Sequence, residues 1–299
     1  MSQGTPQTGY HVADDRAVLR VSGDDRIEFL QGIISSDAAR VSQDIGLWAA
    51  FLTPQGKYLH DFFLVTDGED ILIDCEAARV DDLRKRLRRY TLRSAVTVKA
   101  EPALAVALAI GTDAPIADMA IQYADPRHAE AGWRWIGPEN SLRAAARAAG
   151  LPQHDRSAWD VNRINLGLPD GSRDFEIERS TLAEGNADLL GAVDWQKGCW
   201  MGQEVTARMH YRGLAKRRLV PMRVQGPVPA PGTNVEADGM VVGDCRSSAG
   251  DLVMVLTKID VITGAIADLA AGDASLTPAA PDWLLSSLNS QSGAGVTAV

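Results

Sequence analysis

The chain has 299 residues, 45% of them hydrophobic, with a net charge of −9 and a pI near 5.1. This length allows one large domain or two to three smaller ones with a sizeable core. The acidic balance argues against holding a long nucleic acid by overall attraction, so direct nucleic-acid binding is not expected. No apolar run reaches membrane-spanning length, and no membrane association is expected.

Hydrophobic periodicity predicts a first α+β unit over residues 10–102, after a loose polar tail at 1–9. Its expected elements are a strand at 17–21, a helix from 23 to about 34, strands at 47–52, 59–65 and 71–75, a helix at about 79–90 and a strand at 95–98. This mixture predicts a helix-backed antiparallel sheet.

A second α+β unit is predicted over residues 103–215. Its expected elements are strands at 104–110 and 133–136 and helices at 142–149, 158–166 and from about 203 to 213. From 216 to 285 the pattern becomes β, with alternation at 218–224, 240–246 and 252–259, and it predicts a small barrel or sandwich. The stretch 263–280 receives no assignment, and 286–299 is predicted to be a second loose tail.

Three cysteines, Cys75, Cys199 and Cys245, stand far apart and form no CxxC pair. The spacing predicts neither a disulfide framework nor a resident metal site. Such usage is typical of a reducing compartment, and the first residues lack the basic and apolar regions of a signal peptide. We therefore expect a cytoplasmic protein.

The segment Lys197-Gly198-Cys199-Trp200-Met201-Gly202-Gln203-Glu204 concentrates residue types that carry chemistry. A nearby cation or a helix N-terminus lowers a thiol pKa and raises the reactive thiolate fraction. Lys197 can supply the cation, and the helix expected after Gly202 would begin close to Cys199. The alternative is that Cys199, next to Trp200, is a small buried hydrophobe.

Two further groups of charged residues have a structural and a functional interpretation. Arg208 lies four residues after Glu204, so it can pair with that acid or hold an anionic ligand group. The helix at 79–90 is basic within an acidic protein. Its arginines can form a solvated face, or a docking patch for an acidic partner, RNA or a polyglutamylated folate.

The octet at 197–204 resembles the signature of the YgfZ family of folate-binding proteins, Lys-Gly-Cys-aromatic-x-Gly-Gln-Glu. This family is related to the aminomethyltransferase (T-protein) of the glycine cleavage system. Other stretches similar to family blocks follow in the expected order, at 21–24 with 29–37, 52–57 with Asp61, 90–94 and 163–169. A match of eight residues with fixed cysteine, glycine and charge positions is a specific signal.

The resemblance implies a T-protein-like folate-binding α+β fold, built of ferredoxin-like α+β units with a small C-terminal β-barrel. It implies that Cys199 is an essential thiol whose pKa is lowered by Lys197. Tetrahydrofolate is the implied cofactor, and the residues implied to bind it are Gly198, Gly202, Gln203, Glu204, Arg208, Asp61 and Arg93.

The implied function is support for the assembly or repair of [4Fe–4S] proteins, with an indirect effect on tRNA modification. The implied partners are iron–sulfur assembly or client proteins. One cysteine cannot hold a cluster alone, so any transient cluster would need ligands from a partner. The implied role is that of an assembly factor rather than a conventional enzyme.

A folate-dependent aminomethyltransferase of the T-protein type is the alternative. In T-proteins the block around Asp61 carries a pair of acids, but here the pair reads His60-Asp61, so one acid is replaced. His60 is a candidate for titration near neutral pH, although a lone histidine at a strand edge is more often structural. A pure adaptor, in which Cys199 has no chemical role, is a further alternative.

Overall fold

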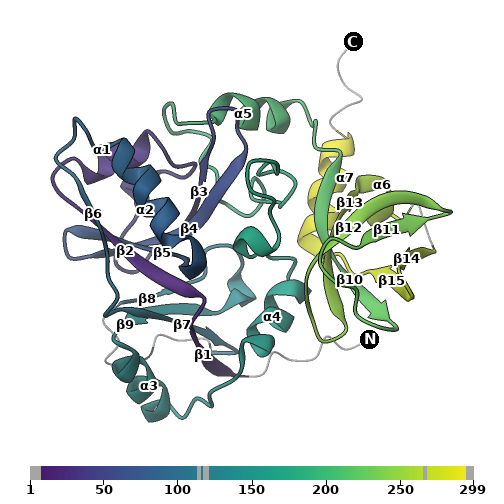
Figure 1. Ribbon diagram of the computed structural model, residues 1–299, viewed down its shortest axis with the longest axis horizontal. Coiled ribbons are helices and arrows are strands. Elements are labelled where there is room, and N and C mark those ends of the chain that lie inside the picture. The colour runs from purple at the N-terminus through teal and green to yellow at the C-terminus, as the bar shows by residue number, and fades with distance from the viewer. Residues whose placement is uncertain (1–7, 113–115, 117–120, 265–267, 294–299) are drawn as a thin grey trace. The chain divides into compact units, whose positions relative to one another are not determined.

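The computed structural model describes residues 8–112, 116, 121–264 and 268–293 (Figure 1). The chain divides into two compact units. We call the first the sheet unit, which comprises the residues up to Trp159 together with Leu190–Gln203. The second is the barrel unit, which comprises Asp160–Leu189 and the residues from Glu204 onward. The predicted tail at 1–9 lies largely outside the described residues.

The first sheet of the sheet unit has the order β3-β4-β5-β2-β6, and every pair in it is antiparallel. Its strands are β2 (Arg16–Ser22), β3 (Leu47–Leu52), β4 (Tyr58–Asp67), β5 (Asp70–Glu76) and β6 (Thr97–Ala100). Two helices, α1 (Arg26–Gln31) and α2 (Val80–Arg89), pack their apolar residues against one face of it (Figure 1). The predicted helix-backed antiparallel sheet is therefore confirmed for this part of the chain.

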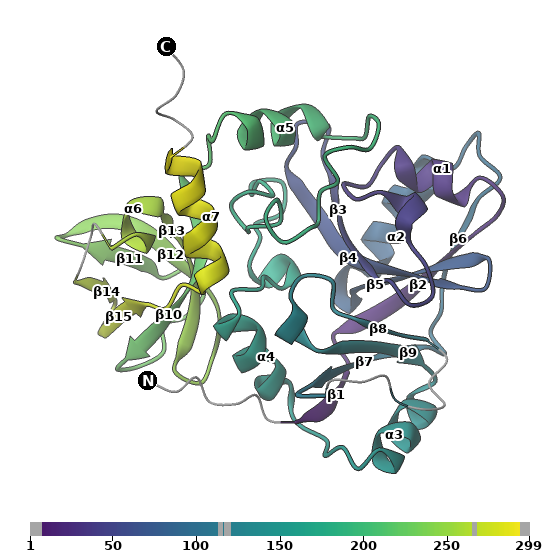
Figure 2. The same ribbon diagram turned by 180° about the vertical axis from the view of Figure 1, so that it is seen from behind.

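The second sheet of the sheet unit has the order β1-β7-β9-β8. Its strands are β1 (Gly9–Ala13), β7 (Ala105–Ile110), β8 (Ile121–Ala124) and β9 (Trp133–Gly137), and α3 (Glu139–Ala148) packs on it (Figure 2). The register pairs Gly9 with Ile110, so the first described strand joins a sheet whose other strands follow about a hundred residues later. Periodicity within a short window cannot reveal such a pairing, because both partners are ordinary strands.

A buried ionic cluster links the two sheets. Arg134 of β9 bonds to Asp74 of β5 at 2.7 Å and to Asp125 at 2.9 Å, and Asp125 also holds Arg127 at 2.8 Å. The Arg134 guanidinium lies 3.4 Å from the centroid of the Phe63 ring. Burial raises the pKa of Asp125, but the two neighbouring guanidinium groups outweigh it and hold that pKa well below its usual value. Buried charges persist only with such partners.

The barrel unit is built around a closed barrel with the order β10-β13-β12-β11-β14-β15. Its strands are β10 (Arg217–Gln225), β11 (Asn234–Ala237), β12 (Met240–Ala249), β13 (Leu252–Lys258), β14 (Leu269–Ala271) and β15 (Ala274–Pro278). Its helices are α6 (Ile259–Ile262), α7 (Asp282–Gly293), most of α4 (Arg156–Asn165) and most of α5 (Gln203–Tyr211). None of the described helices combines the length and apolar character needed to span a bilayer.

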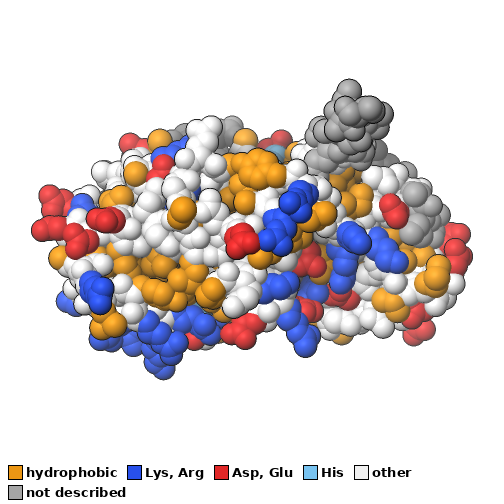
Figure 3. Space-filling view, turned by 90° about the horizontal axis from the view of Figure 1, so that it is seen from above, with side chains coloured by type: hydrophobic (Ala, Val, Ile, Leu, Met, Phe, Trp, Pro, Cys, Tyr) orange, Lys and Arg blue, Asp and Glu red, His pale blue; other side chains and the backbone are white. Residues whose placement is uncertain are grey.

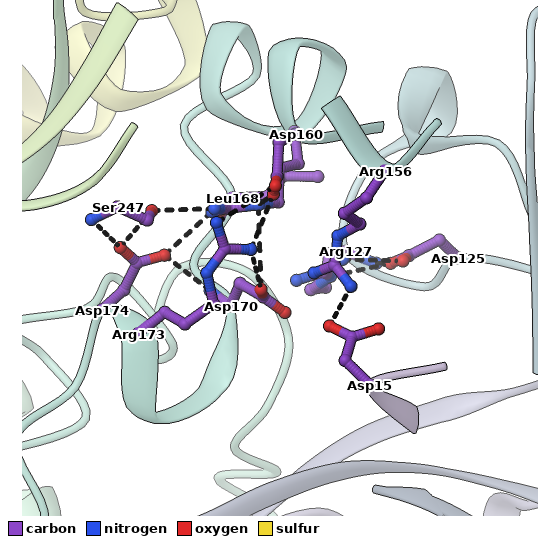
Figure 4. Close-up of polar contacts among 11 residues, drawn as sticks. Asp15, Asp125, Arg127, Arg156, Asp160, Leu168, Asp170, Arg173, Asp174 and Ser247 are labelled. Carbon is purple, nitrogen blue, oxygen red and sulfur yellow. Dashed lines mark hydrogen bonds and ion pairs between the residues drawn. The ribbon is translucent and has the colours of Figure 1, made fainter. Parts of the chain in front are cut away.

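Arg163 of α4 is the centre of a second buried cluster, which lies within the barrel unit (Figure 4). Its guanidinium bonds to Asp160 at 2.5 Å, to Asp174 at 2.9 Å and to the Ser247 hydroxyl of β12 at 2.8 Å. Ser247 also donates to Asp174 at 2.6 Å. The stretch at 163–169 that resembles a family block thus fastens the 160–189 segment to the barrel wall, which is a structural role.

The remaining differences from the predicted elements have local causes. The helix expected from 23 to about 34 ends at Gln31, because the chain turns at Gly32 and Ile34 then forms a bridge with Phe51 of β3. Residues 286–293 continue helix α7, where a tail is predicted, because Leu284 and Leu288 are buried against the barrel core. The unassigned Ala-rich stretch contributes the short strands β14 and β15.

Candidate functional site

Cys199 is the exposed cysteine of the three, whereas Cys75 and Cys245 are buried. Burial raises the pKa of the Cys75 thiol to about 12 and that of Cys245 to about 11. Buried thiols of this kind are inert. Cys199 lies in the segment 194–203, which we call the Cys199 loop and which directly precedes the body of α5. The alternative, that Cys199 is a buried hydrophobe, is therefore wrong.

Lys197 anchors the Cys199 loop to the segment 34–36. Its side chain is buried, and its Nζ donates to the carbonyl oxygens of Ile34 at 2.9 Å and Ser36 at 2.7 Å. Burial lowers the pKa of the ammonium to about 8, and the nearby Asp37 and Asp194 oppose that shift. The ammonium is thus engaged by the 34–36 segment, and the proposed lowering of the thiol pKa by Lys197 stays a prediction.

Asp194 shapes the start of the same loop. One of its carboxylate oxygens accepts from the backbone N–H groups of Gln196 at 2.8 Å and Lys197 at 3.0 Å. The other receives the Arg40 guanidinium at 3.0 Å. Burial raises the pKa of Asp194, but these donors lower it more, so the carboxylate form is favoured.

Gly202 brings the loop against the β3–β4 turn. Its φ is +83°, and a Cβ on it would lie 2.8 Å from the Thr53 carbonyl oxygen and 2.9 Å from Leu52 Cβ. Its neighbour Met201 donates its N–H to the Gly32 carbonyl at 3.1 Å. Only glycine satisfies both the left-handed backbone and this close approach. Gly198, by contrast, has open space around it.

Tyr90, just after α2, packs against the loop as well. Its hydroxyl donates to Met201 Sδ at 3.6 Å, and its ring lies edge-on to Phe51 at 6.1 Å. The stretches 29–37, 52–57, 90–94 and 197–204, which are far apart in the sequence, therefore meet around Cys199. Arg93, predicted to bind folate, lies in this region and is exposed.

The polar side chains at the start of α5 bond to residues close to them in the sequence. The Gln203 side-chain oxygen accepts from the Trp200 N–H at 3.3 Å. Glu204 and Arg208 form an exposed pair at 2.7 Å, one helical turn apart. The structural interpretation of Arg208 is thus realised, and its predicted contact with a folate tail stays a prediction.

Asp61 lies in β4 and is enclosed. Its carboxylate accepts the Trp48 Nε1–H at 2.9 Å and the Tyr58 hydroxyl at 2.6 Å. Next to it, burial and the Arg79 charge lower the pKa of His60 to about 4, while the Asp82 carboxylate, 2.9 Å from His60 Nε2, opposes that shift. The expectation that His60 titrates near neutral pH is wrong, because a buried imidazole beside a guanidinium stays neutral.

A cavity of about 500 Å³ opens in the sheet unit beside the start of the Cys199 loop. Its wall includes two indoles, Trp48 and Trp195, the guanidinium of Arg40 and the hydroxyl of Ser36. Trp48 is also the donor to Asp61, so this acid lies one hydrogen bond behind the wall. None of the residues predicted from the sequence to bind folate lines the cavity. The Trp195 indole just ahead of the octet is the signal that could have found it.

Across the described ranges there is no group of three or more His, Cys, Asp or Glu side chains that could hold a metal ion. An iron–sulfur cluster at Cys199 would therefore be cargo that needs further ligands from another protein. Asp194, which pairs with Arg40, lines the same cavity, so its wall combines a half-buried indole, Trp195, with an ion pair.

Comparisons with known proteins agree with this architecture. Residues 216–286 match the family model "CAF17, C-terminal beta-barrel domain". Human "Iron-sulfur cluster assembly factor IBA57, mitochondrial" is 31% identical over 310 residues, which cover 90% of this chain and 83% of the human one. The mouse protein of the same name is 28% identical over 303 residues, covering 90% of this chain and 84% of its own.

Among solved structures, the glycine cleavage system aminomethyltransferase T from Bartonella henselae superposes with a TM-score of 0.73. It is 13% identical and the match covers 93% of this chain and 86% of that one. This likeness concerns the fold, and it confirms the predicted T-protein-like α+β fold with a C-terminal β-barrel.

The expected cytoplasmic location is wrong, because the human, mouse and Pyricularia oryzae relatives are all named as mitochondrial proteins. The expectation rested on unpaired cysteines and on the composition of the first residues. Free thiols report a reducing environment and do not identify the compartment that provides it.

Proposed function

This chain belongs to the IBA57 family of iron–sulfur cluster assembly factors, and from that premise we propose that its part in assembly depends on the Cys199 thiol. The octet that carries this cysteine further supports a place in the YgfZ branch of folate-binding relatives. The clients are [4Fe–4S] proteins, and tRNA modification is affected indirectly through enzymes that carry such clusters.

The observation that carries the proposal is an exposed thiol on a loop with many fixed contacts. Lys197 bonds to two carbonyls of the 34–36 segment, and Asp194 bonds to two N–H groups of the loop. Gly202 fits against Thr53. Such a loop holds Cys199 at the surface without reorganisation, which is what a site for transfer between proteins requires.

In the proposed chemistry the Cys199 thiol loses its proton and the thiolate sulfur donates to one iron of a cluster. A single cysteine supplies one ligand, so the remaining ligands come from the assembly or client protein that shares the cluster. The bridge is transient because transfer only requires the partner's ligands to replace the Cys199 sulfur. A thiol that reacts as a redox group instead would show mixed-disulfide formation with the partner.

We propose that the cavity bounded by Trp48 and Trp195 holds a tetrahydrofolate. The half-buried Trp195 indole would pack against its rings, with Trp48 buried behind the wall, and Arg40 would contact a folate carboxylate in addition to Asp194. When bound, the folate supplies one-carbon chemistry or serves as a sensed ligand. Trp195→Ala should weaken binding of tetrahydrofolate by about 10-fold or more in calorimetry, whereas Cys199→Ser should bind as the unmodified chain does. Equal binding by both variants would remove this cavity from consideration.

The test of the thiol role uses cells that lack the endogenous gene. The unmodified chain, Cys199→Ser and the buried control Cys75→Ala are expressed at matched levels, and the activity of a radical tRNA-modifying methylthiotransferase is measured. We expect the unmodified chain and Cys75→Ala to restore activity and Cys199→Ser to fail. Full restoration by Cys199→Ser would leave the adaptor role as the better account.

A further inference from the structure

The C-terminal half of α2 and the loop after it carry a group of cations without acidic partners. We call Lys85, Arg88, Arg89 and Arg93 the basic patch. Arg84 and Arg86 pair with the acids of the first helical turn, Asp81 and Asp82. In the part of the chain that the structure describes, by contrast, no carboxylate lies within ion-pair distance of any member of the basic patch.

An apolar surface lies among these cations. Leu92 is 89% exposed and Tyr90 is 44% exposed, and both stand between Arg89 and Arg93 in the chain. A leucine this exposed gains nothing in the free protein, but it is typical of a protein–protein contact rimmed by charges. Figure 3 shows Lys and Arg side chains gathered along one edge of this face next to an apolar area.

The basic patch continues into the Cys199 loop. Tyr90 donates to Met201, two residues after Cys199, so the end of α2 and the loop share one surface of the sheet unit. A protein that covers the patch would therefore reach the thiol from the side of Tyr90. Tyr90 is itself held by the Phe51 ring, which gives this junction a fixed position.

We propose that the basic patch with Leu92 and Tyr90 is the docking surface for an acidic face of the protein that exchanges a cluster at Cys199. The inference rests on the proposed function, since it identifies the partner's chemistry at that site. The chain as a whole is acidic, with a net charge of −9, so the basic patch differs in sign from the overall charge of the protein. The patch thus both attracts the partner and sets its orientation.

RNA is the competing occupant, and the same observations disfavour it. Nucleic-acid binding depends on many phosphate contacts and on a broadly basic surface. Here four cations precede or follow an exposed leucine in the chain of an acidic protein, and the exposed leucine offers nothing to a phosphate backbone. An acidic protein face with an apolar centre satisfies both parts of the surface.

The first test compares two triple variants in the cell assay described above. The patch variant is Arg88→Glu, Arg89→Glu and Arg93→Glu. The control is Lys99→Glu, Arg147→Glu and Lys258→Glu, which changes the net charge equally at exposed positions outside the patch. At matched protein levels we expect the patch variant to lose about 10-fold or more of the restored activity and the control to stay within about twofold. Loss in both variants, or in neither, would overturn the inference.

The second test uses purified protein and does not depend on the proposed function. Two peptides carry a cysteine activated as a thionitrobenzoate mixed disulfide, one flanked by Leu and Glu and the other by Leu and Gln. Cys199 attacks the peptide sulfur, a new disulfide forms, and thionitrobenzoate leaves and is measured by its absorbance. We expect the acidic peptide to react about 10-fold faster at low salt, with the advantage lost at high salt.

The patch variant should reverse the order of the two peptides, and Cys199→Ser should show no rapid release. Equal rates for both peptides on the unmodified chain would overturn the inference even if Cys199→Ser fails in cells. If Cys199→Ser restores the cells while the peptide preference holds, the proposed thiol role falls and the docking surface stands. Binding of a labelled tRNA that is steeply salt-dependent and lost in the patch variant would assign the surface to RNA instead.

Discussion

Asp61 and Cys199 both fall in stretches that resemble blocks of one family, yet the fold encloses one and exposes the other. The Asp61 carboxylate lies inside β4 and accepts bonds from Trp48 and Tyr58. The Cys199 thiol lies at the surface. The hydrogen bonds that hold its loop in place are made by other residues of that loop, such as Lys197. The acid is thus bonded within the protein interior, whereas the thiol is accessible at the surface.

This contrast separates the two candidate functions. A transferase of the T-protein type would need an acid that can reach a bound folate adduct. The assembly role proposed above uses an accessible thiol. The buried and already bonded Asp61 carboxylate disfavours the transferase. The exposed cysteine on the Cys199 loop favours the assembly role, in keeping with membership of the IBA57 family.

The largest expected effect is the difference in reactivity among the three cysteines. With an excess of 5,5′-dithiobis(2-nitrobenzoic acid), the native chain should release about one equivalent of thionitrobenzoate rapidly, from Cys199. Cys75 and Cys245 should react at least about 1000-fold more slowly than Cys199, because both are buried and their thiol pKa values are raised. The Cys199→Ser variant is the control and should show no rapid phase. Release of two rapid equivalents would mean that a second cysteine is accessible.

Removal of the enclosed acid should reduce stability rather than chemistry. Asp61→Ala leaves the Trp48 and Tyr58 donors buried without an acceptor, which should cost about 4 kcal/mol of unfolding free energy. Urea denaturation measures this, and the exposed Asp24→Ala is the control, with an expected change under about 0.5 kcal/mol. The restored activity per folded molecule should not change. A specific loss of activity with full stability would give Asp61 a chemical role.

The neighbouring His60 should make the sheet unit sensitive to mild acid. Its pKa is about 4 in the folded chain against 6.5 in the unfolded one, so the unfolded state binds more protons between these values. Stability should therefore fall as the pH falls from about 6.5 to about 4, by at most about 3 kcal/mol. Unfolding free energies at several pH values measure this, and His60→Gln should flatten the profile. An unchanged profile in that variant would refute the assignment.

Two glycines of the Cys199 loop should differ in their tolerance of a side chain. Gly202→Ala forces a left-handed backbone on alanine and a clash with Thr53, and should cost about 2 kcal/mol. Gly198→Ala is the matched variant, and it should change stability little because its surroundings are open. Thermal unfolding compares the two. Equal effects would mean that the loop adjusts freely and does not hold Cys199 in place.

Local patterns allowed much of the sheet unit to be predicted. The strand expected at 47–52 is β3 to the residue, and the helix expected at 79–90 is α2 within a residue at each end. Here hydrophobic periodicity, turns and burial agree. No strand was predicted at 9–13, and the pairing of β1 with β7 was beyond such patterns, since it depends on which of several similar strands is adjacent in space. The strands β14 and β15, of three and five residues, are too short to show a period.

The candidate site shows the same division. The octet identified Cys199, and Gly202 proves to be sterically required. The hydrogen bonds of the Lys197 ammonium could not be predicted from the sequence, because their acceptors are carbonyl oxygens of residues 161 and 163 positions away in the chain. The wall of the cavity combines side chains from three distant segments, and only the fold brings Trp48, Arg40 and Trp195 together.

The order in which the chain visits its two units has a consequence for truncated products of a gene like this one. The chain passes from the sheet unit into the barrel unit at Asp160, returns at Leu190 and leaves again at Glu204. A stop codon shortly after residue 203 would spare the Cys199 loop in full. It would also remove Arg218, whose guanidinium bonds to the buried Asp188 at 2.8 Å, and Ser247, which bonds to Arg163. The retained 160–189 segment would then lose the barrel that it bonds to, so such a product should be degraded although nearly every residue of its motif is present.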